Sequence, residues 1–187
     1  MALTVIIGED KEKTSEQIAH NIRKNVEDTQ TEEVSYIQDG GAVRPDREVA
    51  EKMADLATRA NANRISFVID QTVEGNDYYG FDVIWELSQI LRPGTPASDF
   101  LLDRNFLVVI ITHYDNKTTV DHLVRRWNNK LPGTIKEGDV EIIKLRSSDD
   151  VDTVLNARRN AVKVLPIVLK SVHTSTLWDL LRKWSTA

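Results

Sequence analysis

The chain has 187 residues, of which 41% are apolar and 28% charged, and its formal net charge is −5. These values are typical of a globular domain and exclude a disordered or fibrous chain. The acidic balance argues against nucleic acid as the main partner. The sequence contains no cysteine, which excludes disulfides, thiolate metal sites and cysteine nucleophiles.

The N-terminal residues pass directly from a short apolar run into acidic residues, a pattern that does not resemble a signal peptide. No run approaches the ~20 consecutive apolar residues that a membrane span needs. We therefore expect a cytoplasmic protein without membrane contact.

Strand and helix patterns alternate along the chain. Apolar runs rich in Val and Ile predict strands at residues 3–8, 65–70, 106–112 and 140–144, with a weaker strand at 33–38. Apolar residues at helical spacing predict helices at 14–26, 45–60, 81–91, 120–127 and 151–161. The four strong strands are continuously apolar rather than alternating, so helices should cover both faces of the sheet.

The end of the chain departs from this alternation. Pro166 is expected to interrupt a helix, and residues 174–182 are expected to form a short amphipathic turn with Leu177, Trp178 and Leu181. We therefore divide the chain into a domain at residues 1–160 and a C-terminal helical extension at 161–187, packed on the domain or on a partner.

Five strand and helix pairs in succession predict an α/β fold with right-handed crossovers and a doubly wound, five-stranded parallel sheet. Ligands of such sheets bind beyond the carboxyl ends of the strands, where the strand order reverses. The residues that end each apolar run are therefore the candidates for a binding site.

Those residues form a chemically coherent set. Glu9 and Asp10 follow the first strand, Asp70 ends the third, Thr112 ends the fourth and Lys144 ends the fifth. In the strand order 2-1-3-4-5, the first and third strands are neighbours, so three carboxylates should share one crevice. Carboxylate oxygens are the ligands that Mg²⁺ prefers, and a hydroxyl and an ammonium on the next strands could hold phosphoryl oxygens.

This arrangement resembles the receiver domain of two-component response regulators, which has the flavodoxin-like order 2-1-3-4-5. The sequence Gly80-Phe81-Asp82-Val83 also looks like the start of the third helix of a receiver. The resemblance covers residues 2–160.

The resemblance implies that Asp70 is a phosphoacceptor and that Mg²⁺ is held by Glu9, Asp10 and Asp70. It implies that Thr112 and Lys144 bind the phosphoryl group and act in the switch. The implied partners are a histidine kinase or phosphotransfer protein and a downstream protein, without a DNA-binding output. A homodimer is left open.

Several positions differ from the receiver pattern. The loop after Asp70, which contains Thr72, is about two residues longer than usual and lacks the customary proline. His113 follows Thr112 where receivers have a small residue, so His113 and Thr72 are candidates for a gate over the site. Glu141 and Leu145 stand where receivers have an aromatic residue and a proline.

Two alternatives follow from these differences. The chain could be a receiver-like interaction module that no longer depends on phosphorylation. It could also be a magnesium-dependent phosphatase of the haloacid dehalogenase type, which forms an aspartyl phosphate. Thr72 disfavours the phosphatase, because those enzymes usually place a second aspartate two residues after the nucleophile.

Overall fold

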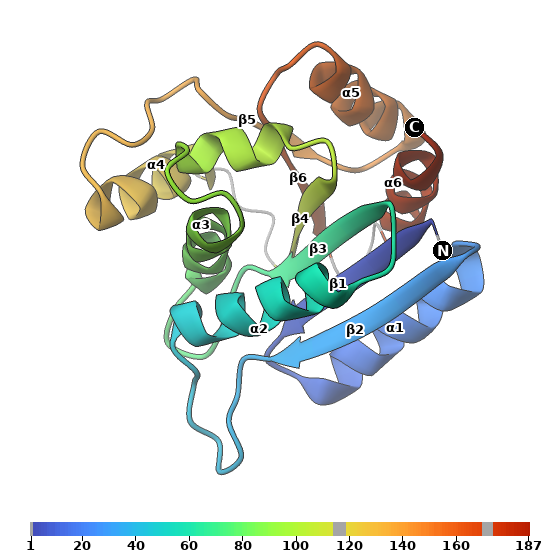
Figure 1. The fold of residues 1–187 in the computed structure, drawn as a ribbon, viewed down its shortest axis with the longest axis horizontal. Coiled ribbons are helices and arrows are strands. Elements are labelled where there is room, and N and C mark those ends of the chain that lie inside the picture. Colours follow the sequence, from blue (N-terminus) through green and yellow to red (C-terminus); the bar gives the residue numbers. More distant parts are fainter. Residues whose placement is uncertain (1, 114–118, 170–173) are drawn as a thin grey trace.

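The computed structural model describes residues 2–113, 119–169 and 174–187 and shows one parallel sheet between two layers of helices (Figure 1). The strands are β1 (Leu3–Glu9), β2 (Thr29–Ser35), β3 (Arg64–Asp70), β4 (Phe106–Thr112), β5 (Glu141–Lys144) and β6 (Val164–Leu169). The helices are α1 (Glu12–Asn25), α2 (Asp46–Arg59), α3 (Tyr79–Leu91), α4 (Thr119–Lys130), α5 (Ser148–Arg159) and α6 (Thr174–Thr186), with a 3₁₀ helix, η1, at Ala97–Leu102.

The strand order is β2-β1-β3-β4-β6-β5, and every pair is parallel. The α/β class and the parallel sheet are therefore confirmed, but the five-stranded order is wrong beyond β4. A sixth strand, β6, lies between β4 and β5, so β5 is at the edge of the sheet.

Pro166 accounts for the missed strand. The sequence pattern predicts that Pro166 interrupts a helix, yet Pro166 lies inside β6, in register with Ile143 of β5. Pairing of β6 with β4 begins only at Ile167. The missing N–H of Pro166 therefore lies outside the β4–β6 ladder, which is how a strand between two others tolerates a proline.

Side chains alternate between the two faces of the sheet and pack into two separate hydrophobic cores. Val108 and Ile110 of β4 lie in the core beneath α2, α3 and α4, whereas Val109 and Ile111 lie in the core beneath α1, α5 and α6. Trp127 of α4 is fully buried in the first core. Both faces are covered, which explains why the central strands are continuously apolar.

The described part of residues 161–187 supplies β6 and α6 rather than a purely helical extension. Helix α6 buries Leu177, Leu180, Leu181 and Trp184 in the core that it shares with α1 and α5. Among the described residues, no helix has the length and apolar character needed to cross a membrane.

Candidate functional site

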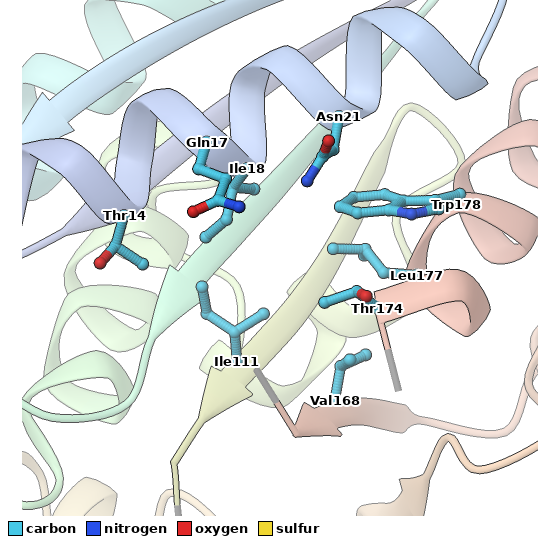
Figure 2. A pocket seen from close by; sticks show the side chains of 9 residues that line it. All are labelled: Thr14, Gln17, Ile18, Asn21, Ile111, Val168, Thr174, Leu177 and Trp178. Atoms are coloured by element: carbon cyan, nitrogen blue, oxygen red, sulfur yellow. The ribbon is translucent and has the colours of Figure 1, made fainter. Parts of the chain in front are cut away.

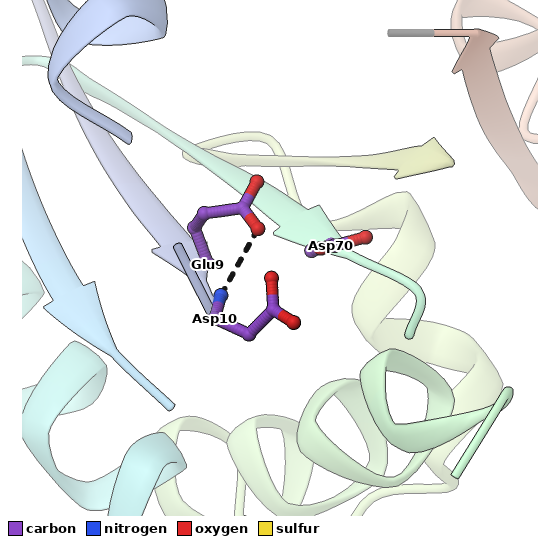
Figure 3. Close-up of side chains that lie close together, drawn as sticks. All are labelled: Glu9, Asp10 and Asp70. Atoms are coloured by element: carbon purple, nitrogen blue, oxygen red, sulfur yellow. Dashed lines mark hydrogen bonds between the residues drawn. The ribbon is translucent and has the colours of Figure 1, made fainter. Parts of the chain in front are cut away.

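Three carboxylates meet at the carboxyl ends of the two central strands. Glu9 ends β1, Asp10 follows it, and Asp70 ends β3, the neighbour of β1. One oxygen from each side chain lies within 4.8 Å of the others. Figure 3 shows the three side chains gathered at the tips of these strands.

The cluster is largely removed from solvent. Glu9 and Asp70 are each 1% exposed, and Asp10 is partly buried. The Glu9 Oε1 atom accepts hydrogen bonds from the backbone N–H groups of Asp10 (3.0 Å) and Lys11 (3.4 Å). Asp70 Oδ1 accepts one from the backbone N–H of Thr72 (3.3 Å).

The donor set fits a hard divalent cation. All three groups offer oxygen, and buried carboxylates at this separation repel one another unless positive charge offsets them. Mg²⁺ takes six oxygen ligands in an octahedral shell, so a carboxylate cluster that binds it leaves further positions for water or phosphate. Glu9, Asp10 and Asp70 could therefore hold Mg²⁺.

An acidic cleft extends from this cluster across the ends of β1 and β2 to the start of α1. Its cavity is about 530 Å³ in volume. Its acidic lining residues are Glu9, Asp10, Glu12, Glu16, Glu33 and Asp39. Arg44 is the one basic residue that the described part of the chain contributes to this lining, so negative charge is in excess, and the approach to the cluster favours cations.

Two residues outside β3 contact the backbone carbonyl of Asp70. The hydroxyl of Tyr36, just beyond β2, donates to the Asp70 backbone carbonyl at 3.1 Å. Gly80, in the first turn of α3, lies so close that a Cβ atom there would be 2.5 Å from the same carbonyl oxygen. Tyr36 and Gly80 therefore fix the backbone of Asp70.

Tyr36 was not identified from the sequence. Its side chain is fully buried, its ring lies over Gly8, and its ring centroid is 4.8 Å from that of Tyr79. Burial raises the pKa of Tyr36 well above its usual value, and the negative charges of Asp70 and Glu9 raise it further. The glycine at the end of β1 was the available signal, because it leaves room for an aromatic ring.

Thr112 and His113 lie next to the cluster along the sheet. Thr112 ends β4, one residue beyond the partner of Asp70 in the β3–β4 register, and is 1% exposed. His113 is exposed and Thr72 is partly buried. A role for Thr112 in phosphate binding, and for His113 and Thr72 as a gate, remains a prediction.

Lys144 lies farther along the sheet than the sequence analysis expected. It ends β5, the edge strand, and β6 separates that strand from β4. The residue that follows β6 in the sequence is Lys170, which lies outside the described residues. The apolar run at 164–169 was the available signal for the sixth strand.

A second cavity, between α1 and α6, has a different chemical character (Figure 2). Its volume is about 210 Å³, and Ile18, Ile111 and Leu177 contribute to an apolar wall beside the amides of Gln17 and Asn21. Because no charged side chain of the described residues lines it, this cavity is not a candidate metal or phosphate site.

Comparisons with known proteins do not assign the chain to a family. No protein-family model matches the sequence, and no curated protein matches it.

Proposed function

We propose that this chain is a receiver-type phosphoacceptor, in which Asp70 is phosphorylated with the help of Mg²⁺ held by Glu9, Asp10 and Asp70. One observation carries the proposal: these three carboxylates, from two neighbouring strands, place oxygens within 4.8 Å of one another. Two acidic residues after the first strand and one at the end of the third are the arrangement that a receiver needs.

In the proposed reaction, an Asp70 carboxylate oxygen attacks the phosphorus of a phosphodonor. A new oxygen–phosphorus bond forms while the bond to the leaving group breaks, and the leaving group departs with its electron pair. Mg²⁺ would neutralise charge on the phosphoryl oxygens. Tyr36 and Gly80 hold the backbone of the nucleophile, and the Thr112 hydroxyl would donate to a phosphoryl oxygen.

A lysine ammonium is expected to pair with the phosphoryl group, and two residues are candidates for it. Lys144 is the candidate from the sequence analysis, but it lies at the edge of the sheet. Lys170 follows β6, the neighbour of β4. The Lys144→Ala and Lys170→Ala variants distinguish the two, because only loss of the pairing lysine should reduce phosphorylation.

The proposed partners are proteins. A histidine kinase or phosphotransfer protein would supply the phosphoryl group in the cytoplasm, and a downstream protein would read the phosphorylated state. The acidic charge of the chain agrees with an output through protein contacts rather than through DNA.

The test is phosphorylation by a small donor. The full chain is incubated with Mg²⁺ and acetyl phosphate, and intact mass is measured; we expect a gain of one phosphoryl group. The gain should vanish in Asp70→Asn and persist in Asp55→Asn, an exposed carboxylate on α2 whose side chain is 62% exposed. The absence of a gain in the wild type, or an equal gain in Asp70→Asn, would exclude the proposal.

A second candidate is a receiver-like module that acts without phosphorylation. The burial of Asp70, at 1% exposure, favours it, because a phosphodonor must reach that carboxylate. Metal binding and phosphorylation together separate the two candidates. Binding of Mg²⁺ without a mass gain would favour the module, and a mass gain would exclude it.

A further inference from the structure

A basic cavity lies at the opposite end of the sheet from the carboxylates. Arg64 is the first residue of β3, Arg104 precedes β4, and Arg158 and Arg159 end α5. The other lining residues are Leu102, Leu155, Ala161, Trp184 and Ala187. The cavity volume is about 410 Å³, within the size range of small-molecule sites.

This cavity carries an excess of positive charge. Four arginines line it and no acidic side chain of the described residues does, while the backbone oxygen of Ala187, the last residue, also lines it and accepts from Arg64. None of the four forms an ion pair with an aspartate or glutamate in the described ranges, although the chain as a whole is acidic. An excess of arginine side chains around a cavity is the arrangement that binds an anion.

The side chain of Arg158 is held in the wall of the cavity by hydrogen bonds. The guanidinium of Arg158 donates to the backbone carbonyls of Leu101, Asp103 (2.6 Å) and Phe106 (2.8 Å). Burial lowers the pKa of Arg158 to about 10; the carboxylate of Asp103 opposes this shift, and the positive charge of Arg64 adds to it. Arg158 therefore remains a cation at neutral pH, in a fixed position.

The other arginines keep donors for a ligand. Arg104 is exposed and makes no hydrogen bond to the described part of the chain, and Arg159 uses only Nη1, which donates to Asn156 at 3.0 Å. Arg64 donates from Nη2 to the Ala187 carbonyl, and its guanidinium lies 4.4 Å from the ring centroid of Trp184. Each guanidinium has five N–H groups, so most of the donors of Arg104 and Arg159 are available.

We infer that this arginine cavity binds a small anion that carries phosphate groups. A planar guanidinium can donate two parallel N–H groups to two oxygens of one phosphate. Several guanidinium groups around one cavity therefore suit an anion with more than one negative charge. The volume of the cavity favours a small molecule over a polymer, and the negative charge of the whole chain would repel nucleic acid. The inference is independent of the proposed phosphorylation of Asp70.

Inorganic pyrophosphate is a suitable probe, and isothermal titration calorimetry of the full chain is a suitable measurement. EDTA is included so that metal at the carboxylates does not contribute. We expect a saturable signal with one pyrophosphate per chain, and weaker binding at high salt because the contact is ionic.

Two exposed arginines and one matched control locate the site. Arg104→Ala and Arg159→Ala should each weaken binding about tenfold, the change expected when one charge-assisted hydrogen bond is lost. Arg59→Ala removes the same charge from the far end of α2, where the side chain is 66% exposed, and should leave binding unchanged. Asp70→Asn should also leave it unchanged.

Two results would overturn the inference. The first is the absence of a saturable signal at millimolar pyrophosphate. The second is an equal loss of affinity in Arg59→Ala and Arg104→Ala, which would show that only the overall charge matters. The three arginine variants alter exposed side chains, and Asp70→Asn alters a buried one, so thermal unfolding is measured for all four to establish that they remain folded.

Discussion

At the residue scale, the position of Asp70 depends on two residues that take no part in the proposed chemistry. Tyr36 reaches from the end of β2 to donate to the Asp70 carbonyl, and Gly80 allows the start of α3 to approach the same atom. A carboxylate that must accept a phosphoryl group needs a fixed backbone, because small misplacements slow such reactions strongly.

Replacing Tyr36 with phenylalanine removes the hydroxyl and keeps the ring. We expect a loss of about 1 kcal/mol in the free energy of unfolding, the usual net value of a buried hydrogen bond, measured by urea denaturation. We also expect slower phosphorylation by acetyl phosphate. Tyr78→Phe is the matched control, because Tyr78 is only partly buried and stacks on His122.

The same tyrosine predicts a dependence of stability on pH. The pKa of Tyr36 in the folded chain is raised above the ordinary value of 10.0. The folded state therefore retains the proton more tightly, and this contribution to stability is complete below pH 10 and is lost as pH rises toward the folded pKa. Above pH 10 the free energy of unfolding should fall more steeply in the wild type than in Tyr36→Phe.

Gly80→Ala tests the close approach of α3 to Asp70. The added Cβ would lie 2.5 Å from the Asp70 oxygen and 2.9 Å from Gln71 Cα, and both of these are backbone atoms. The start of the helix must move, at a cost of roughly 1–3 kcal/mol. Urea denaturation measures the loss. An alanine variant as stable as the wild type would show that the contact is not tight.

At the element scale, the central strands β1, β3 and β4 could be predicted because each has a continuous apolar run of its own. The apolar runs of β1, β3 and β4 are buried on both faces, and each ends in a polar residue of the candidate site. Their parallel pairing follows from the helices between them. The convergence of Glu9, Asp10 and Asp70 could therefore be anticipated from the sequence.

The order of the last strands could not be anticipated in the same way. Strand β6 contains a proline, and a single sequence does not show that the ladder to β4 starts beyond it. Strand β2 was expected at 33–38 but runs from Thr29 to Ser35. It is an edge strand with many polar residues, so its hydrophobic pattern is weak. Because the expected strand extended to residue 38, it included Tyr36, and the contact of Tyr36 with the site was missed.

The first turn of α5 is held by a reciprocal cap. Ser147 accepts from the backbone N–H of Asp150, and the Asp150 carboxylate accepts from the backbone N–H groups of Arg146 (2.8 Å) and Ser147 (3.0 Å). These hydrogen bonds lower the pKa of Asp150, with that from Arg146 contributing most.

Asp150→Asn should therefore reduce stability by about 0.5–1 kcal/mol at neutral pH. Because the folded pKa of Asp150 is lowered, its contribution is present above the ordinary pKa of 3.8 and is lost as pH falls through the folded value. The difference between wild type and variant should shrink below about pH 4. Asp149→Asn, one residue earlier and exposed, is the control, and a similar loss there would contradict the role of the cap.

An ion pair connects α3 and α4. Arg126 donates to both oxygens of Asp82, from Nε at 3.1 Å and from Nη2, and Asp82 is only 5% exposed. Arg126→Ala leaves a buried carboxylate without its cation, which should cost roughly 1–3 kcal/mol. Arg125→Ala removes the neighbouring exposed arginine, and urea denaturation should find it close to the wild type.

At the scale of the whole molecule, the two ends of the sheet carry opposite charge. The carboxyl ends gather Glu9, Asp10 and Asp70 in one cluster beside an acidic cleft, and the amino ends border a cavity lined by arginines. The net charge of −5 does not reveal this separation. Cations and phosphate-bearing anions are thus expected at different ends of the same fold, and the two proposals can be tested separately.

Binding of Mg²⁺ to the acidic end should stabilise the whole chain, since a ligand that binds only the folded state adds RT ln(1 + [L]/Kd) to the free energy of unfolding. At a concentration one hundred times Kd the gain is about 2.7 kcal/mol, which thermal unfolding detects as a higher midpoint. Because three side chains share the ion, Asp70→Asn and Glu9→Gln should each abolish most of the shift, whereas Asp55→Asn should retain it. A shift of equal size in all four proteins would mean that Mg²⁺ acts elsewhere on the acidic surface.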